Sequence, residues 1–282
     1  MPDAFRSRYG PRALVAGGSV GLGAEWARQL AARGLDLVVV AESDDPLKAH
    51  CEALAHEYGV DVRSAVIDLA DADVLDRVQA ELGELEIGLL VYNAAQSYVG
   101  NFLDQDLDGK LRTLDVNCRG PLLLAHHFGR AMAERGRGGI VLMSSLSCLQ
   151  GTPLVATYAA TKAFNLILGE ALWEELRHLG VDVLTVIAGA MRTPGWEQTR
   201  PDQSRFSPPV MEVEPVVREA LGALGRTPSI VPGRANRWSA RLLSRLLPRK
   251  RAVETMGRSM RSLYADQVKR QPIPSGTRSA RD

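Results

Sequence analysis

Tyr158 and Lys162 stand four residues apart in a stretch that favours a helix, and Ser145 ends an apolar run thirteen residues before Tyr158. Side chains at positions i and i+4 share one helix face, with Cβ atoms about 5–6 Å apart. An ammonium placed there can stabilise a tyrosinate, so that a phenol that ordinarily titrates near ~10 exchanges its proton closer to neutrality. Taken alone, a Tyr–Lys pair of this spacing is also common on helix surfaces, so the pair by itself leaves both interpretations open.

A second group of residues has the types needed to hold a dinucleotide. Gly17, Gly21 and Gly23 lie between an apolar run and a helix-forming stretch. The chain can therefore turn tightly there and present the bare N–H groups of a helix N-terminus to a pyrophosphate. Glu42 follows the next apolar run, where an acid hydrogen-bonds the ribose 2′-hydroxyl of NAD. No Arg or Lys stands at positions 20, 43 or 44 to neutralise a 2′-phosphate, so NAD is predicted in preference to NADP.

The glycine-rich stretch has a rival interpretation. Gly17-Gly18-Ser19-Val20-Gly21 also matches GxSxG, the nucleophile elbow of α/β-hydrolases, with Ser19 as the nucleophile. An elbow needs earlier strands and an oxyanion loop before it, and only 16 residues precede Gly17. The context therefore favours dinucleotide binding over a hydrolase.

The elements that must position these residues alternate along the chain. Runs that are apolar on successive residues predict strands buried on both faces of a parallel sheet, and amphipathic stretches between them predict helices. The expected strands are Arg12–Ala16, Leu35–Val40, Val60–Ile67, Gly88–Tyr92, Gly139–Ser144, Val181–Ile187 and Ser229–Val231. The expected helices are Leu22–Arg33, Pro46–Tyr58, Asp71–Leu82, Leu107–Arg135, Thr157–Leu179 and Glu214–Leu224. We therefore expect an α/β fold with a doubly wound, Rossmann-like parallel sheet of about seven strands.

The motifs taken together resemble the short-chain dehydrogenase/reductase family over about residues 12–200. The resemblance rests on GxxxGxG at 17–23, Asp68-Leu69, Asn93-Ala94-Ala95, Asn117, Ser145 and Tyr158-Ala-Ala-Thr-Lys162, in order and at the expected spacing. It implies a hydride-transferring oxidoreductase in which Tyr158 is the acid/base, Lys162 lowers its pKa and binds the nicotinamide ribose, Ser145 polarises the substrate carbonyl, and Asn117 holds a relay water. It also implies a cofactor site made of Gly17, Ser19, Val20, Gly21, Leu22, Gly23, Glu42, Asp68, Leu69, Asn93, Ala94, Ala95, Tyr158, Lys162, Gly189 and Thr193.

Four positions depart from the family pattern. Ala16 replaces the usual Thr before the first glycine, Tyr92 and Ala95 replace the first Asn and the Gly of NNAG, and Ala188 replaces Pro before Gly189. These changes put loop rigidity and cofactor affinity in doubt. The four catalytic positions are intact.

The resemblance places the substrate over the carboxyl ends of the strands. The side chains expected there are mostly apolar or neutral, which predicts a bulky, hydrophobic ketone or secondary alcohol. They are Gln96, Tyr98, Leu146, Gln150, Met191 and Trp196. Two alternatives stay open, an NADP-dependent 3-oxoacyl-type reductase and a non-catalytic dinucleotide-binding protein.

Charge is distributed unevenly along the chain. Residues 226–282 hold 14 Lys or Arg and three acids, whereas the rest holds 20 against 30. Beyond the catalytic domain, expected over 1–232, we expect a basic amphipathic helical extension at 233–270, with helices at Asn236–Leu247 and Val253–Tyr264, and a disordered tail at 271–282. The first of these helices could contact an anionic membrane or an acidic partner through 236–251, or its apolar face could cover the substrate cleft or a neighbouring subunit.

Composition bounds the remaining choices. The 282 residues are 45% hydrophobic and 24% charged, as in globular proteins, and no apolar run reaches the roughly 18 residues needed to cross a bilayer. Three separated cysteines and the absence of a signal sequence favour the cytoplasm. No spacing of histidines predicts a metal, and no motif predicts nucleic-acid binding. The resemblance implies a homodimer or homotetramer.

Overall fold

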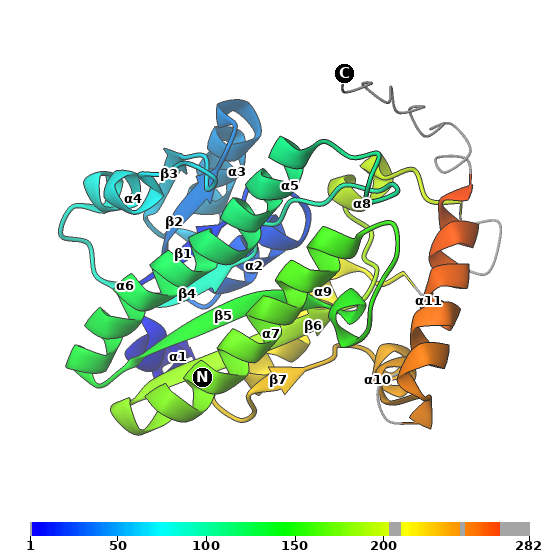
Figure 1. Cartoon of the computed structure of the whole chain (residues 1–282). Coiled ribbons are helices and arrows are strands. Elements are labelled where there is room, and N and C mark those ends of the chain that lie inside the picture. Colours follow the sequence, from blue (N-terminus) through cyan, green and yellow to red (C-terminus); the bar gives the residue numbers. More distant parts are fainter. Residues whose placement is uncertain (1, 203–209, 243–245, 266–282) are drawn as a thin grey trace, which may run out of the picture.

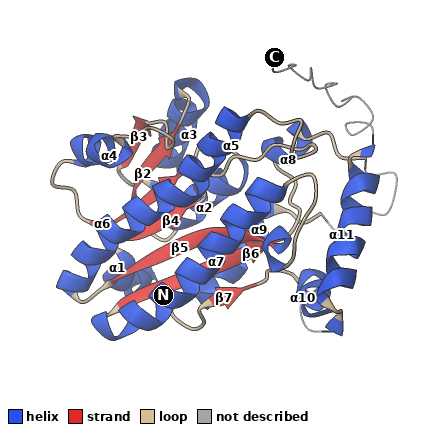
Figure 2. Cartoon of the chain, viewed as in Figure 1, coloured by secondary structure: helices blue, strands red, loops and turns tan. Residues whose placement is uncertain are grey.

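The computed structural model describes residues 2–202, 210–242 and 246–265, which form a three-layer α/β fold around one sheet (Figures 1 and 2). Seven parallel strands lie in the order β3-β2-β1-β4-β5-β6-β7. The order reverses between β1 and β4, and in open α/β sheets ligands bind at the carboxyl ends of the strands next to such a reversal. The strands are β1 (Arg12–Ala16), β2 (Asp36–Ala41), β3 (Val62–Val66), β4 (Ile87–Tyr92), β5 (Gly138–Ser145), β6 (Val181–Ala188) and β7 (Ser229–Ile230).

The alternation of side chains along each strand divides the core into two halves. Val15, Val39 and Val91 pack on one face of the sheet, and Leu14, Val38 and Leu90 on the other. Helices α2 (Gly21–Ala31), α3 (Asp44–Tyr58) and α9 (Val213–Ala223) cover the first face. Helices α4 (Val74–Leu82), α6 (Gly120–Arg135) and α7 (Ala156–Leu176) cover the second. The prediction of a doubly wound parallel sheet is confirmed.

A helix that the sequence did not predict begins the described chain. Helix α1 (Pro2–Tyr9) is short and strongly polar, so no apolar periodicity marks it. Its attachment is tertiary, because the Tyr9 hydroxyl donates to Asp182 Oδ2 at 2.7 Å and the Arg8 guanidinium does so at 2.6 Å. Asp182 is an acidic residue within the otherwise apolar strand β6. This acid was the feature of the sequence that indicated a polar partner for β6.

The single helix predicted over 107–135 contains a π-helical turn. Helix α5 (Leu107–Leu114) continues through Asp115–Arg119 in π form into α6. The Tyr92 hydroxyl donates to Val116 O at 2.7 Å, and a Cβ on Gly120 would lie 2.2 Å from that hydroxyl. Tyr92, one of the departures from the family pattern, thus supports the turn that carries Asn117.

The C-terminal region is helical but differs from the predicted bounds. Helix α8 (Pro194–Gln198) is not among the predicted helices, α10 spans Arg234–Arg241, and α11 spans Arg249–Leu263. Helix α11 stands beside the carboxyl ends of the strands (Figure 1), and Val253 lies against Gly151. The tail predicted at 271–282 lies outside the described residues. Within the described ranges, none of the helices combines the length and apolar character required to span a membrane.

Other predicted boundaries moved by a few residues. Helix α4 starts at Val74 instead of Asp71, and the helix predicted to run to Leu179 ends as α7 at Leu176, followed by a 3-10 turn over Arg177–Leu179. Strand β3 is shorter than the predicted Val60–Ile67 and is exposed at several positions, because it forms the edge of the sheet.

Candidate active site

Tyr158, Lys162 and Ser145 meet where β5 ends and α7 begins. Ser145 is the last residue of β5, and Tyr158 and Lys162 lie in the first two turns of α7. Lys162 is buried, and its Nζ donates to Met143 O at 3.0 Å and lies 5.6 Å from the centroid of the Tyr158 ring. Strand β5 therefore fixes the ammonium beside the phenol through a backbone acceptor.

The environment of the pair sets its proton affinities. Burial lowers the pKa of Lys162 to about 8. Burial also raises the pKa of Tyr158, with hydrogen bonding by the Ser145 hydroxyl acting in the opposite direction. The resemblance implies that Lys162 lowers the pKa of Tyr158, and this role stays a prediction. The ammonium faces the aromatic ring of Tyr158 and donates to Met143 O.

Asn117 is fully buried and occupies the π-helical turn. Its Oδ1 accepts from Gln96 N at 2.8 Å, and its Nδ2 donates to Gln96 O at 2.9 Å and to Thr161 Oγ1 at 2.9 Å. The amide thus ties the segment after β4 to α7, one residue before Lys162. Its predicted role in holding a relay water stays a prediction.

The glycine-rich turn after β1 fits a pyrophosphate. A Cβ on Gly23 would lie 1.8 Å from Gly17 O, and a Cβ on Gly17, which has φ +78°, would lie 2.6 Å from Ala94 Cα. Val20 precedes α2 and offers no side-chain cap, so no side chain of the N-cap residue competes with an anion for the first N–H groups of the helix. Asn93 Nδ2 donates to Gly17 O at 2.8 Å.

Backbone bonds compensate for the departure at Ala16. The N–H groups of Asn93 and Ala94 both donate to Ala16 O, at 3.0 and 2.8 Å. The turn is therefore joined to the end of β4 without the usual Thr hydroxyl. Leu22 and Leu69 are buried in the core, so only their backbones are available to a cofactor.

The adenosine end contains a residue that the sequence did not suggest. Arg112, from α5, donates through Nη2 to Glu42 Oε1 at 2.8 Å and through Nη1 to Asp68 Oδ2 at 2.7 Å. Burial alone would raise the pKa of Asp68, but the hydrogen bonds from Arg112 and the Ala70 N–H outweigh it and keep that pKa below its usual range. A cation therefore does face Glu42. It is Arg112, which lies 70 residues from Glu42 in the sequence, and not a residue at position 20, 43 or 44.

At the other end of the predicted cofactor site, Thr193 and Gly189 lie next to segments from the later part of the chain. A Cβ on Gly21 would meet Thr193 at 3.2 Å, so the glycine turn and the segment before α8 are in contact. Gly189 faces Asn236 of α10, whose Nδ2 would lie 2.4 Å from an added Cβ. Ser19 and Ala95 make no side-chain contact that distinguishes a role for them among the described residues.

The side chains predicted to line the substrate site leave polar atoms unpaired. Gln96 Oε1, Gln150 Oε1 and Trp196 Nε1 are buried and lack a hydrogen-bond partner among the described residues. Leu146 is half-buried, Tyr98 is exposed and accepts from Gln96 Nε2 at 2.7 Å, and Met191 packs on the core near Met211.

The end of helix α11 packs against residues near the predicted substrate site, a placement that the sequence did not predict. Its last residue Leu263 and the following Tyr264 are buried against Leu154 and Trp196. The Tyr264 hydroxyl lies 3.1 Å from Thr199 Oγ1.

Comparison with known proteins identifies the family. The family model described as short chain dehydrogenase matches residues 11–204, which contain the glycine-rich turn, Asn117, Ser145, Tyr158 and Lys162. The chain belongs to the short-chain dehydrogenase family. This short-chain dehydrogenase is therefore a member of an oxidoreductase family, and the hydrolase interpretation of Ser19 is wrong, because the GxSxG match is part of the glycine-rich turn of the dehydrogenase fold.

Individual relatives of this short-chain dehydrogenase include a hydroxysteroid dehydrogenase and a 3-oxoacyl-CoA reductase. It is 30% identical to the 7beta-hydroxysteroid dehydrogenase of Clostridium sardiniense, over 83% of this chain and 89% of that one. It is 32% identical to the very-long-chain 3-oxoacyl-CoA reductase of Bos taurus, over 77% and 69%. A solved short-chain dehydrogenase from Sphingobium yanoikuyae in complex with NADPH has a TM-score of 0.73 and 34% identity, with 82% and 91% covered.

Proposed function

We propose that this protein transfers a hydride between a nicotinamide dinucleotide, with NAD preferred, and a bulky hydrophobic ketone or secondary alcohol. The observation that carries the proposal is the placement of Ser145, Tyr158 and buried Lys162 at the carboxyl edge of the sheet, next to a glycine turn shaped for a pyrophosphate. The relatives that act on hydroxysteroids and long-chain 3-oxoacyl substrates support the substrate class.

Each of these residues has a separate role in proton transfer or charge stabilisation. A bound dinucleotide supplies or accepts the hydride at its nicotinamide ring. The Ser145 hydroxyl donates a hydrogen bond to the substrate carbonyl oxygen, and Tyr158 gives its proton to the same oxygen, so that negative charge does not accumulate there. Lys162 holds positive charge beside Tyr158, and Asn117 keeps the segment carrying Gln96 in place.

The proton affinities favour reduction of the ketone near neutral pH. A Tyr158 whose pKa is raised by burial carries its proton, which is the form that reduction consumes. Lys162, with a pKa of about 8, is mostly an ammonium at pH 7. Alcohol oxidation needs Tyr158 as a base and is expected to become faster as pH rises.

A 3-oxoacyl-type reductase that uses NADP is a second candidate. Arg112 beside Glu42 offers a cation where a 2′-phosphate would lie, and the relative from Sphingobium yanoikuyae is in complex with NADPH. The Bos taurus relative supports an acyl substrate. The predicted choice between the cofactors depends on how far Arg112 offsets Glu42.

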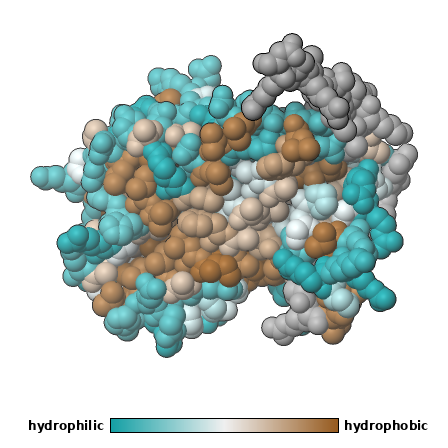
Figure 3. Space-filling model, in the orientation of Figure 1, coloured by the Kyte–Doolittle hydropathy of each residue, from teal (hydrophilic) through white to brown (hydrophobic). Residues whose placement is uncertain are grey.

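We also propose that the protein forms a homodimer through α6 and α7. Hydrophobic side chains gather over these two helices (Figure 3), and Leu122, Phe164 and Ile167 are exposed there. An exposed apolar surface on two adjacent helices is typical of an interface between subunits.

The decisive experiment is calorimetric titration with NAD, NADH, NADP and NADPH, followed by turnover of the preferred reduced cofactor with hydroxysteroid-type and 3-oxoacyl ketones. Tighter binding of NAD(H) and oxidation of NADH by a bulky ketone is the expected result. Tighter binding of NADP(H), with turnover of a 3-oxoacyl thioester, would establish the second candidate. Binding without turnover of any ketone or alcohol would support a non-catalytic protein, and absence of binding would overturn both proposals.

A further inference from the structure

Helix α10 turns its apolar side chains away from the body of the protein. Its inner positions are Asn236 and Ala240, which are buried. Trp238, midway between them, is 71% exposed, and Leu242 is 50% exposed. A surface helix ordinarily directs its apolar stripe to the core and its polar residues to water. The apolar face of α10 therefore does not cover the substrate cleft of its own chain, one of the outcomes considered from the sequence.

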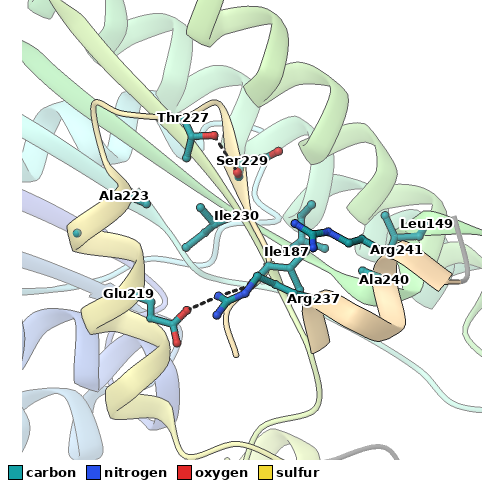
Figure 4. A pocket seen from close by; sticks show the side chains of 12 residues that line it. Leu149, Ile187, Glu219, Ala223, Thr227, Ser229, Ile230, Arg237, Ala240 and Arg241 are labelled. Atoms are coloured by element: carbon teal, nitrogen blue, oxygen red, sulfur yellow. Dashed lines mark hydrogen bonds and ion pairs between the residues drawn. The ribbon is translucent and has the colours of Figure 1, made fainter. Parts of the chain in front are cut away.

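Contacts on the inner side fix this orientation. Arg237 Nη1 lies 2.8 Å from Glu219 Oε2 of α9 (Figure 4), and Asn236 fits against Gly189, where a Cβ would lie 2.4 Å from Nδ2. A cavity of about 620 Å³ lies between α9, β7 and α10, lined by Ile187, Ile230 and Ala240 among others. Charged side chains also line this cavity, Glu219, Arg237 and Arg241 among them, and Trp238 is not one of its lining residues.

The outward face is also strongly basic. Residues 234–251 contain seven Lys or Arg and no acid. Arg234 and Arg251 are exposed and form no ion pair with another described residue, whereas Arg241 lines the cavity. We call the exposed residues Arg234, Trp238, Leu242, Leu246 and 249–251 the α10 face; Leu246 is 72% exposed.

We propose that the α10 face seats the protein on an anionic lipid surface. An aromatic ring and two leucines flanked by arginines suit the boundary between lipid headgroups and acyl chains, where the apolar groups enter and the guanidinium groups remain with the phosphates. Each Lys or Arg close to an anionic membrane strengthens binding about fivefold. A flat lipid surface also needs no groove on the protein, and Trp238, Leu242 and Leu246 are all exposed.

Two other occupants fit less well. A second copy docking α10 on α10 about a twofold axis would place the basic side chains of one α10 face against those of the other, which repels the pair. An acidic protein would satisfy the arginines, but it would have to supply its own apolar pocket for Trp238. The membrane accounts for both the charge and the outward indole.

The location has a consequence for catalysis that rests on the proposed function. Helix α11 begins with residues 249–251 of the α10 face. At its other end, Leu263 and the following Tyr264 pack beside Leu154 and Trp196. A hydrophobic ketone dissolved in lipid would then be taken up close to the site that reduces it.

The test is binding of the full-length protein to vesicles of phosphatidylcholine with roughly one-third phosphatidylglycerol, compared with phosphatidylcholine alone. Trp238 provides the signal, because the other three tryptophans, Trp26, Trp173 and Trp196, are buried or half-buried. We expect the emission to shift to shorter wavelength with the anionic vesicles, the shift to vanish in Trp238→Phe, and added salt to release the protein.

Matched variants separate this proposal from its rivals. Trp238→Ser with Leu246→Ser should weaken vesicle binding at least tenfold, and Leu103→Ser, at an exposed leucine outside the α10 face, should leave it unchanged. Equal binding of both vesicle types, or no binding, would overturn the proposal. So would a fall in oligomer mass in the double variant without a change in vesicle binding, since the α10 face would then be a subunit contact. Dinucleotide binding, measured in parallel, reports on the proposed function independently.

Discussion

The two ends of the predicted cofactor site are built differently. At the catalytic end, Lys162 and Asn117 are buried, and both form hydrogen bonds to the backbone. At the adenosine end, Glu42 is 72% exposed and is held by Arg112, a long side chain from another element. The first end is rigid because backbone acceptors fix it, whereas the second depends on an ion pair that solvent weakens.

The contrast indicates where each property of the enzyme is determined. Chemistry requires a fixed distance between proton donor and substrate oxygen, and a buried, backbone-bonded site provides it. Cofactor choice depends on the charge near one ribose hydroxyl, and two or three exposed side chains decide it. We therefore expect changes at the catalytic end to affect turnover strongly and changes at the adenosine end to affect preference moderately.

The largest effect is expected at the catalytic end. Tyr158→Phe removes the proton donor and should lower kcat by about 10²–10⁴-fold. Dinucleotide binding should stay close to that of the unmodified protein, because the ring remains over Lys162. Tyr264→Phe, the matched control at a neighbouring buried phenol bonded to Thr199, should cost less than about tenfold. Loss of cofactor binding in Tyr158→Phe would contradict the assigned role.

The turn between the two ends should be the next most sensitive. Gly23→Ala places a Cβ 1.8 Å from Gly17 O, so the turn must open, and dinucleotide affinity should fall about 10–100-fold. Gly222→Ala, in α9, meets no atom within 4 Å and should leave the affinity unchanged. Calorimetric titration measures both. Equal affinities in the two variants would show that the pyrophosphate does not bind at this turn.

The pH dependence of reduction should report on Lys162. Its pKa of about 8 means that the ammonium is present below pH 8 and is lost above it. We expect kcat/KM for ketone reduction to be level at lower pH and then to fall about tenfold per pH unit as the ammonium deprotonates. Lys162→Arg keeps the charge at all these pH values and should move the fall upward in pH. An unchanged inflection in that variant would assign it to another group.

The same contrast explains what could be predicted from sequence. Tyr158, Lys162 and Ser145 are close in sequence on one helix and the strand before it, so their spacing was enough to predict their meeting. Arg112 lies 44 residues from Asp68 and 70 from Glu42 and reaches them through a flexible side chain, which no periodicity encodes. The structural roles of Tyr92 and Tyr264 were not predicted for a related reason. The role of Tyr92 depends on a π turn, and that of Tyr264 depends on the packing of α11.

The smallest expected effect tests the adenosine end most directly. Arg112→Met removes the cation between Glu42 and Asp68, so two carboxylates would face the 2′ position without compensation. The affinity for NADPH should fall relative to that for NADH by about fivefold, the effect of losing one partly exposed charge interaction of about 1 kcal/mol.

Arg130→Met removes the same charge from an exposed pair with Glu134 on α6 and should leave the NADH/NADPH ratio as it was. If both variants shifted the ratio equally, the effect would come from net charge alone. If Arg112→Met left the ratio unchanged while Tyr158→Phe abolished turnover, the catalytic end would be correctly assigned, and Glu42 would discriminate between the cofactors without Arg112. The roles assigned to the two ends of the site can therefore be tested independently, because different residues and interactions build each end.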